Sequence, residues 1–318
     1  MTRAIRLNKG PSFATVLRNN GIYIGFLLIF LAFSFSSPYF FDLNNLKNII
    51  VQSSINAVVA IGMTMVIITG GIDLSVGSLV ALTSMVSAIL ITKLGVPVWA
   101  SAILGIVIGG LCGLVNGSII SYGKVPAFIT TLGMMSFARG LALYSTGGKP
   151  IAELPASYES IAGTKLGGVP IFILYCVVLY LVAWVFLTRC RGGRYIYAIG
   201  GNRDSARLSG MNVRFNETIA YTICGITAGL GGILLTARLN YATPTAGSGF
   251  EMDAIAAAVI GGTSLSGGQG NVLMALLGAM LIGMLKNGLT LLNVSSYLQQ
   301  MVIGVVIVLA VFLDRKKS

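Results

Sequence analysis

Long apolar runs separated by short polar segments fill most of the chain. A transmembrane helix needs about 20 mostly apolar residues, and nine runs are near or above that size: residues 21–36, 48–68, 75–92, 98–121, 126–146, 169–187, 218–237, 272–291 and 296–313. A further run, residues 254–265, is too short to cross as a straight helix and leads into GGTSLSGGQG. The pattern predicts an all-α, polytopic membrane protein of about ten spans, with broken helices near residues 70–73 and 261–270.

One long polar segment, residues 188–217, interrupts this pattern between the sixth and seventh long runs. It contains six arginines and must lie at one face of the membrane. Within it, Asn202 is expected to cap a short helix over residues 203–209, and Gly210 to end that helix in a left-handed conformation. Such a helix either docks a partner or tethers two spans while its arginines touch lipid headgroups.

The basic residues are distributed unevenly over the predicted loops. In the ten-span arrangement, fourteen Lys or Arg fall on the side of the polar segment and five on the other side, which includes a long loop at residues 147–168. Because Lys and Arg accumulate on the cytoplasmic side, both termini and the 188–217 loop are predicted to be cytoplasmic. The organisation is then an N-terminal tail (residues 1–20), one transmembrane domain (21–313) and a C-terminal tail (314–318). The first run lacks a small-residue cleavage site and is expected to anchor the chain.

Composition supports a membrane protein and argues against several other classes. Hydrophobic residues make up 55% of the chain and charged residues 9%, whereas soluble domains carry about a quarter charged residues. The net charge of +12 lies between the spans, where it orients the chain and meets anionic lipid, so nucleic acid is not expected as a partner. The four cysteines show no C-x-x-C spacing, and histidine is absent.

No enzyme motif is found in the chain. The sequence has no G-x-x-x-x-G-K-[ST], H-E-x-x-H or G-x-S-x-G motif. We therefore expect no catalytic, metal or cofactor site here, and any ATP-driven process would need another chain to bind the nucleotide.

The two predicted breaks resemble each other, reading GGIDLSVG at residues 70–77 and GGTSLSGG at residues 261–268. Glycine-interrupted segments at matching places in two halves are typical of a transport pathway. Chance similarity, or close packing of small residues, explains the pair equally well. Asp73, in the first break, either caps the following helix or has a functional role, and the two are compatible.

Polar side chains on the apolar runs are candidates for a hydrophilic path, although hydrogen bonds between helices would also explain them. These candidates are Gln52, Asn56, Asp73, Ser75, Asn116, Thr130, Thr131, Thr263, Ser264 and Asn287. Arg139 and Lys286 are expected either to reach a membrane face, as we favour for Lys286, or to pair with a carboxylate. Glu251 and Asp253 are expected at the outer mouth, where they meet an external partner or cap the next helix.

Four segments carry a resemblance to one family. The strings GMTMVIITGGIDLSVGSLVAL, GRYIYAIGGNRDSARLSGMNV, PTAGSGFEMDAIAAAVIGGTSLSGGQG and NGLTLLNVSSYLQQMVIGVVIVLAVFLD closely resemble the permease subunit of bacterial ribose ATP-binding-cassette importers. The resemblance runs from about residue 36 to the C-terminus. It implies a homodimeric permease in the bacterial inner membrane, which receives a pentose from a secreted binding protein. A cytoplasmic ATPase with two cassettes, which binds ATP and Mg²⁺, would drive it.

In that family the segment matching residues 201–210 is the coupling helix that docks on the ATPase. The resemblance assigns this role to Gly201, Asn202, Arg203, Ser205, Ala206, Arg207, Ser209 and Gly210. The segment reads NRDSARLSG and lacks the E-A-A form of the coupling motif. Similar permeases serve xylose, allose, galactosides or autoinducer-2, so ribose is the first choice among several sugars. A different class also stays open: an ATP-independent channel, or a proton-coupled carrier in which Asp73 titrates.

Overall fold

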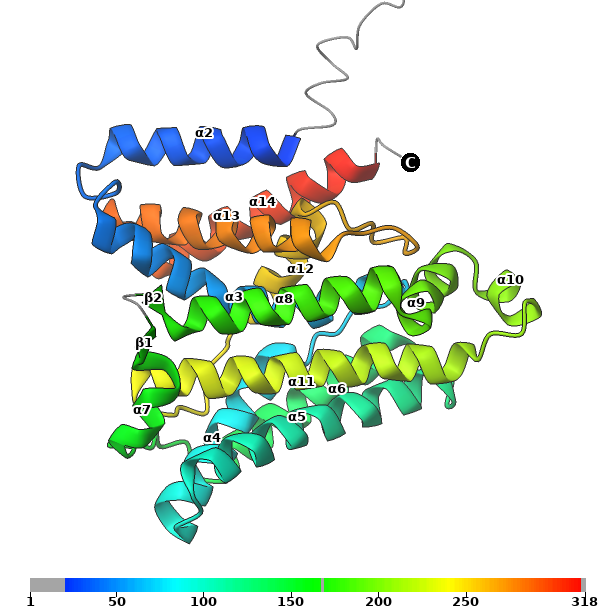
Figure 1. Ribbon diagram of the computed structural model, residues 1–318, viewed down its shortest axis with the longest axis horizontal. Coiled ribbons are helices and arrows are strands. Elements are labelled where there is room, and N and C mark those ends of the chain that lie inside the picture. The colour runs from blue at the N-terminus through cyan, green and yellow to red at the C-terminus, as the bar shows by residue number, and fades with distance from the viewer. Residues whose placement is uncertain (1–20, 167–168, 316–318) are drawn as a thin grey trace, which may run out of the picture.

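The computed structural model describes residues 21–166 and 169–315, and within them the protein is almost entirely helical. Among the described residues, seven helices are long and apolar enough to cross a membrane: α3 (Leu43–Ile68), α4 (Val76–Leu94), α5 (Val98–Ser121), α6 (Ala127–Tyr144), α8 (Ile171–Arg189), α11 (Val213–Leu239) and α13 (Val272–Leu291). Two further apolar helices, α2 (Gly21–Ser36) and α14 (Ser296–Arg315), lie along the same bundle (Figure 1). The prediction of a helical membrane protein is confirmed.

The shorter elements lie at the ends of the bundle or inside it. Helix α7 (Ala156–Gly163) and the two-residue strands β1 (Lys165–Leu166) and β2 (Val169–Pro170) lie at one end, and α9 (Arg191–Gly201) and α10 (Arg203–Leu208) at the other. Helix α12 (Phe250–Ile260) lies among the long helices. The start of α2 and the end of α14 both lie toward the end that carries α9 and α10 (Figure 1).

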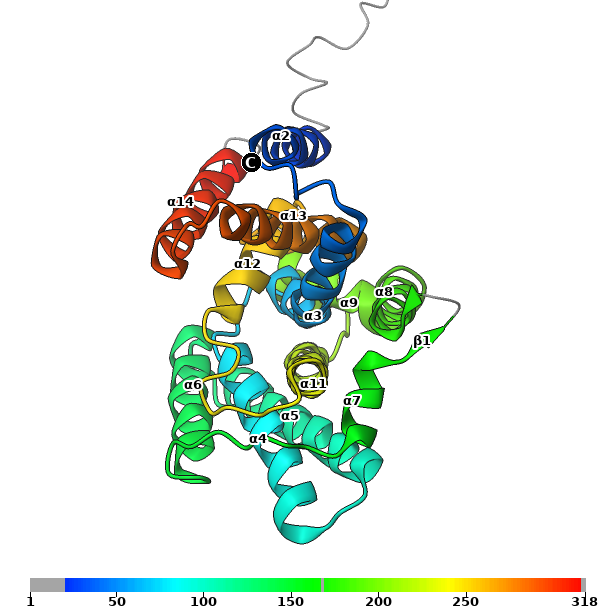
Figure 2. The ribbon, with the colours of Figure 1, turned by 90° about the vertical axis from the view of Figure 1, so that its left-hand side faces the viewer.

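Helix α11 occupies the middle of the bundle and packs against α5, α3 and α4 (Figure 2). Its close approach to α5 depends on glycines repeated at four-residue intervals on α5, because residues four apart lie on one face of a helix. A methyl group added at Gly109 would lie 3.0 Å from the Gly229 Cα, and one at Gly113 would lie 3.1 Å from the Gly225 Cα. Small residues let two backbones touch, and this contact drives helix association where burial from water contributes little.

Both predicted helix breaks are present. Helix α3 ends at Ile68, Gly70 adopts a left-handed φ of +86°, and α4 begins at Val76. Helix α12 has only 11 residues, and α13 starts at Val272 after a loop with left-handed φ values at three glycines. These φ values favour glycine, which lacks the Cβ that would clash there.

Several helix boundaries differ from the prediction, each for a local reason. Helix α3 starts at Leu43 because the Asp42 carboxylate accepts the Asn44 backbone N–H at 2.7 Å, which caps the helix earlier than hydropathy indicates. Helix α11 starts at Val213 for the same reason, with Asn212 accepting from Phe215 N–H at 3.1 Å. The polar segment 188–217 is therefore mostly helical, and its C-terminal residues are the first turn of α11.

The expected loop at residues 147–168 contains α7, which the hydropathy pattern did not show. Tyr158 anchors this helix: its side chain is fully buried, and its hydroxyl lies 3.0 Å from the Ser87 hydroxyl. Burial raises the pKa of Tyr158 to about 12. One buried tyrosine in a short polar segment is a weak sequence signal, which is why the helix was missed.

We expect Gly225→Ala to lower the free energy of unfolding by about 1–3 kcal/mol, because its methyl group would press on the Gly109 carbonyl. The thermal midpoint of the purified protein in detergent measures this. Gly140→Ala on α6 is the matched control, since its methyl group meets nothing within 4 Å and alanine favours the helix. Equal midpoints for the two variants would contradict the packing argument.

Candidate functional site

The polar end of the bundle forms a compact unit of three helices. Side chains from α9, α10 and the start of α11 share a small buried core of Ile199, Ala206 and Val213. Helix α9 is amphipathic, with Gly193, Ile196 and Ile199 buried and its arginines on the opposite face. The three helices can therefore move as one body, because a packed core transmits displacement.

Helix α10 is capped at both ends as predicted. The Asn202 side-chain oxygen accepts the Ser205 backbone N–H at 2.8 Å, and Gly210 follows with a φ of +79°. The helix spans Arg203–Leu208, one residue shorter than the predicted 203–209. A six-residue helix is marginal by itself, so its caps and its contacts with α9 and α11 hold it in place.

A bidentate ion pair attaches α10 to α11. Both terminal nitrogens of Arg203 donate to the Glu217 carboxylate, each at 2.7 Å. The Glu217 side chain is 6% exposed and that of Arg203 is 51% exposed, so a buried carboxylate pairs with a guanidinium at the surface. The hydrogen bond with Glu217 raises the pKa of the Arg203 guanidinium. This geometry fixes orientation as well as distance.

The outer surface of α10 is free within the described chain. Of the residues assigned to docking by resemblance, Ala206 is the exception, because its side chain is buried in the small core. The rest of that set is exposed: Gly201, Asn202, Arg203, Ser205, Arg207, Ser209 and Gly210. Sequence reasoning missed Leu208, whose side chain is 83% exposed at the end of the helix. An isolated leucine in a polar stretch was the signal that could have found it.

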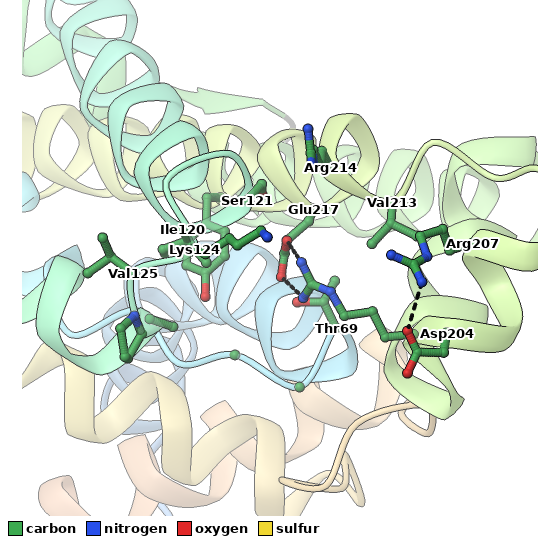
Figure 3. Close-up of a pocket in the computed structure, with 16 residues that line it drawn as sticks. Thr69, Ile120, Ser121, Lys124, Val125, Asp204, Arg207, Val213, Arg214 and Glu217 are labelled. Carbon is green, nitrogen blue, oxygen red and sulfur yellow. Dashed lines mark hydrogen bonds and ion pairs between the residues drawn. The ribbon is translucent and has the colours of Figure 1, made fainter.

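A pocket of about 480 Å³ lies beside this unit (Figure 3). The first helix break, the α5–α6 turn, α10 and the start of α11 line it, with Lys124 and the Arg203–Glu217 pair on its walls. Arg214 also lines the pocket, and its guanidinium lies 5.7 Å from the centre of the Tyr122 ring. The buried Tyr221 hydroxyl and Ser121 Oγ have no hydrogen-bond partner among the described residues. Such groups can bind water or a hydroxylated solute.

Four of the predicted path residues come together at the first break. The Asp73 carboxylate accepts from the Ser75 backbone N–H at 2.9 Å and from its hydroxyl at 2.6 Å. Asn116 on α5 donates to the Ser75 hydroxyl at 3.1 Å. Thr131 on α6 is buried beside them, with its hydroxyl 3.4 Å from the Ile72 carbonyl. Asp73 thus accepts the Ser75 backbone N–H, as the capping interpretation predicted. The residue directly before α4 is nevertheless Ser75 itself.

Asp253 differs from its expected place at the outer mouth. Its side chain is 3% exposed, and its carboxylate forms an ion pair with Lys286 and accepts from the Asn56 amide at 3.2 Å. Lys286 accordingly pairs with a carboxylate and does not extend to a membrane face. A charge inside the bundle is costly unless it is paired, and this pair joins α12 to α13 and α3.

Arg139 also points into the protein. Its guanidinium donates to the Pro244 and Ala246 carbonyls at 2.6 and 2.9 Å and so holds the loop that precedes α12. The half-buried Glu251 begins α12 close to Gly77. Arg139 therefore fixes the broken helix through backbone acceptors.

The remaining path candidates are scattered. Asn287 exchanges two amide hydrogen bonds with Asn45, at 2.9 and 3.0 Å, and Thr130 bonds within its own helix. Gln52 is half-buried on α3. Thr263 and Ser264 lie in the second break, where the buried Thr263 hydroxyl has no partner among the described residues. The candidates thus form two buried groups, around Asp73 and around Asp253, and several isolated positions.

The part of the chain that the structure describes gives no support for a metal-binding site. No group of three or more His, Cys, Asp or Glu side chains comes together there. The four cysteines are free thiols, of which Cys190 is exposed and Cys176 and Cys224 are buried.

Comparison with known proteins identifies close relatives. Residues 45–311 match the family described as branched-chain amino acid transport system / permease component. The ribose import permease of Escherichia coli K12 is 46% identical over 93% of both chains, and that of Bacillus subtilis 168 is 43% identical over 96% of this chain and 95% of its own. The D-allose transport system permease of Escherichia coli K12 is 39% identical over 89% of this chain and 86% of its own. No solved structure matches.

We expect Asp253→Ala to lower the free energy of unfolding by about 3 kcal/mol, because it leaves the Lys286 charge unpaired inside the bundle. The double variant Asp253→Leu with Lys286→Met should regain most of this loss, since it removes both charges. Thermal unfolding in detergent compares the variants, with Lys93→Met as the exposed control. If the single variant matches the double variant, the pair does not stabilise the fold.

Proposed function

Because the chain belongs to the family of branched-chain amino acid transport system permease components, we propose that it is the membrane-spanning subunit of an ATP-driven sugar importer whose cargo is ribose. Similarity to ribose import permeases over more than nine-tenths of the chain supports the cargo. The protein functions in the bacterial inner membrane. It is not an enzyme, and a separate ATPase subunit hydrolyses ATP.

The observation that carries the proposal is the platform formed by α10. This helix is capped at both ends, clamped by the Arg203–Glu217 pair and exposed on its outer surface. A partner that binds α10 would contact a helix whose position is fixed, because α10 is packed onto α9 and α11. In the proposed assembly, this platform is cytoplasmic and docks on the ATPase, which binds ATP and Mg²⁺.

The finer architecture follows from the same assignment. Seven long helices, the apolar helices α2 and α14, and the half-length α12 give ten membrane segments, with both termini on the cytoplasmic side. Two copies of the chain would enclose the path, each docking on one of two cassettes. A secreted binding protein would deliver the sugar to the end that carries α7.

The transport cycle is derived from this geometry. ATP binding draws the two cassettes together and with them the two α10 platforms, and the packed helices convert this into opening toward the loaded binding protein. Hydrolysis then resets the platforms. The pocket beside α10 offers hydroxyl and charged groups to a sugar near the inner face, where weak contacts favour release.

Uptake of labelled ribose into vesicles that contain the permease, its ATPase and its binding protein tests the proposal. Uptake should require ATP inside and binding protein outside. Uptake of allose or a galactoside in place of ribose would transfer the assignment to that sugar, a runner-up supported by the D-allose relative and a galactose/methyl galactoside relative. Ribose flux through the permease alone would favour a channel or a proton-coupled carrier.

We expect Arg207→Ala to weaken ATPase binding by about tenfold, because arginine is a frequent anchor of protein interfaces. Arg207 is largely exposed, and its link to Asp204 is long, at 3.8 Å. Copurification of the ATPase at graded concentrations measures the loss. Arg194→Ala on α9 is the control, since it removes an equally exposed arginine outside the platform. Identical losses from both variants would contradict docking at α10.

A further inference from the structure

The two glycine-rich breaks, which lie about 190 residues apart in the sequence, meet at a single point in the structure. The Gly268 backbone N–H donates to the Ile68 carbonyl oxygen at 2.9 Å. This carbonyl belongs to the last turn of α3, where helices leave acceptors without an internal partner. The second break therefore completes the hydrogen bonding of the helix that ends in the first break.

The end of α9 is inserted at this meeting point. A methyl group at Gly200 would overlap the Ile68 carbonyl oxygen and the Gly268 nitrogen. One at Gly267 would lie 3.1 Å from both the Gly200 and the Gly70 Cα. Three backbone segments are thus in direct contact, with no side chain between them.

A second contact ties α9 to the same loop. The Tyr197 hydroxyl, one turn before Gly200, donates to the Gly270 carbonyl oxygen at 2.8 Å. Gly270 directly precedes the Asn271 cap of α13. Helix α9 thus contacts the first break through its backbone and the second break through both backbone and side chain.

Helix α9 is also fixed to α10 through the small core of Ile199, Ala206 and Val213. An unbroken series of contacts therefore runs from the exposed platform to Gly200, and from Gly200 to both breaks. We propose that the end of α9, at Tyr197 and Gly200, is the positioning element that transmits movement of the ATPase to both broken helices together.

This inference rests on the proposed function and adds a route for the force. One break leads into α4 and the other joins α12 to α13. A displacement of α9 would shift both breaks in the same stroke, because backbone atoms in contact cannot evade one another by changing rotamers.

The test separates ATP hydrolysis from transport in the full complex of permease, ATPase and binding protein. Gly200→Ala should lower sugar uptake per ATP hydrolysed by about tenfold, while ATP hydrolysis without binding protein stays within about twofold of the unsubstituted complex. Gly25→Ala on α2 is the matched control, because its methyl group would meet only the Leu281 side chain at 3.9 Å.

Tyr197→Phe provides a milder variant that keeps the shape of the side chain. Loss of one hydrogen bond should lower uptake per ATP by about threefold. The control is Tyr195→Phe on the same helix, since the Tyr195 hydroxyl makes no hydrogen bond within the described residues. If Gly200→Ala prevents assembly, Tyr197→Phe decides the question alone.

Two results would overturn the positioning role alone. The first is unchanged uptake per ATP in Tyr197→Phe. The second is an equal loss of uptake and hydrolysis in Gly200→Ala and Tyr197→Phe, which a merely structural defect would produce. A different result bears on the proposed function. An unsubstituted complex that takes up no sugar with ATP would overturn that function, and this inference with it.

Discussion

Direct backbone contact at glycine is the interaction on which the rest of this structure depends. Apolar helices in a membrane gain little by leaving lipid for one another, so close packing must hold them together. Helix α11 has this contact with α5 at Gly225 and Gly229. Because α11 is held along its length, its N-terminal part can present Glu217 to α10 as a fixed anchor. The position of the docking platform is therefore set by packing deep in the bundle.

The buried carboxylates of the bundle lie beside its two broken segments and make polar contacts there. The Asp253 carboxylate contacts Lys286 and Asn56, and one oxygen of the Asp73 carboxylate accepts from Ser75 while the other has no partner among the described residues. Each group joins a broken helix to its neighbours. Buried charges that the sequence marks as functional candidates thus also hold the broken segments in place, so removing one would disturb the fold.

Local rules predicted a large part of this architecture. Apolar runs located the spans, the glycine clusters located both breaks, and Asn202 with Gly210 defined α10 almost to the residue. Long-range relations were not accessible. The pairing of Asp253 with Lys286 depends on how α12 packs against α13, and hydropathy says nothing about that. Helix α9 was hidden because glycines lie near both ends of a short segment that has two arginines in its first turn and was interpreted as a loop.

The two kinds of contact around α9 and α10 suit different tasks. The Arg203–Glu217 pair joins two side chains that have several torsions each, and its guanidinium is half-exposed. The contact of Gly200 with Ile68 and Gly268 has no such freedom, because its atoms belong to the backbone. In the proposed assembly, the Arg203–Glu217 pair would hold α10 in place for the ATPase, and the backbone contact at Gly200 would pass the displacement to the breaks. Any side chain in place of Gly200 would push these backbone segments apart, because even its Cβ would overlap the Ile68 carbonyl oxygen and the Gly268 nitrogen.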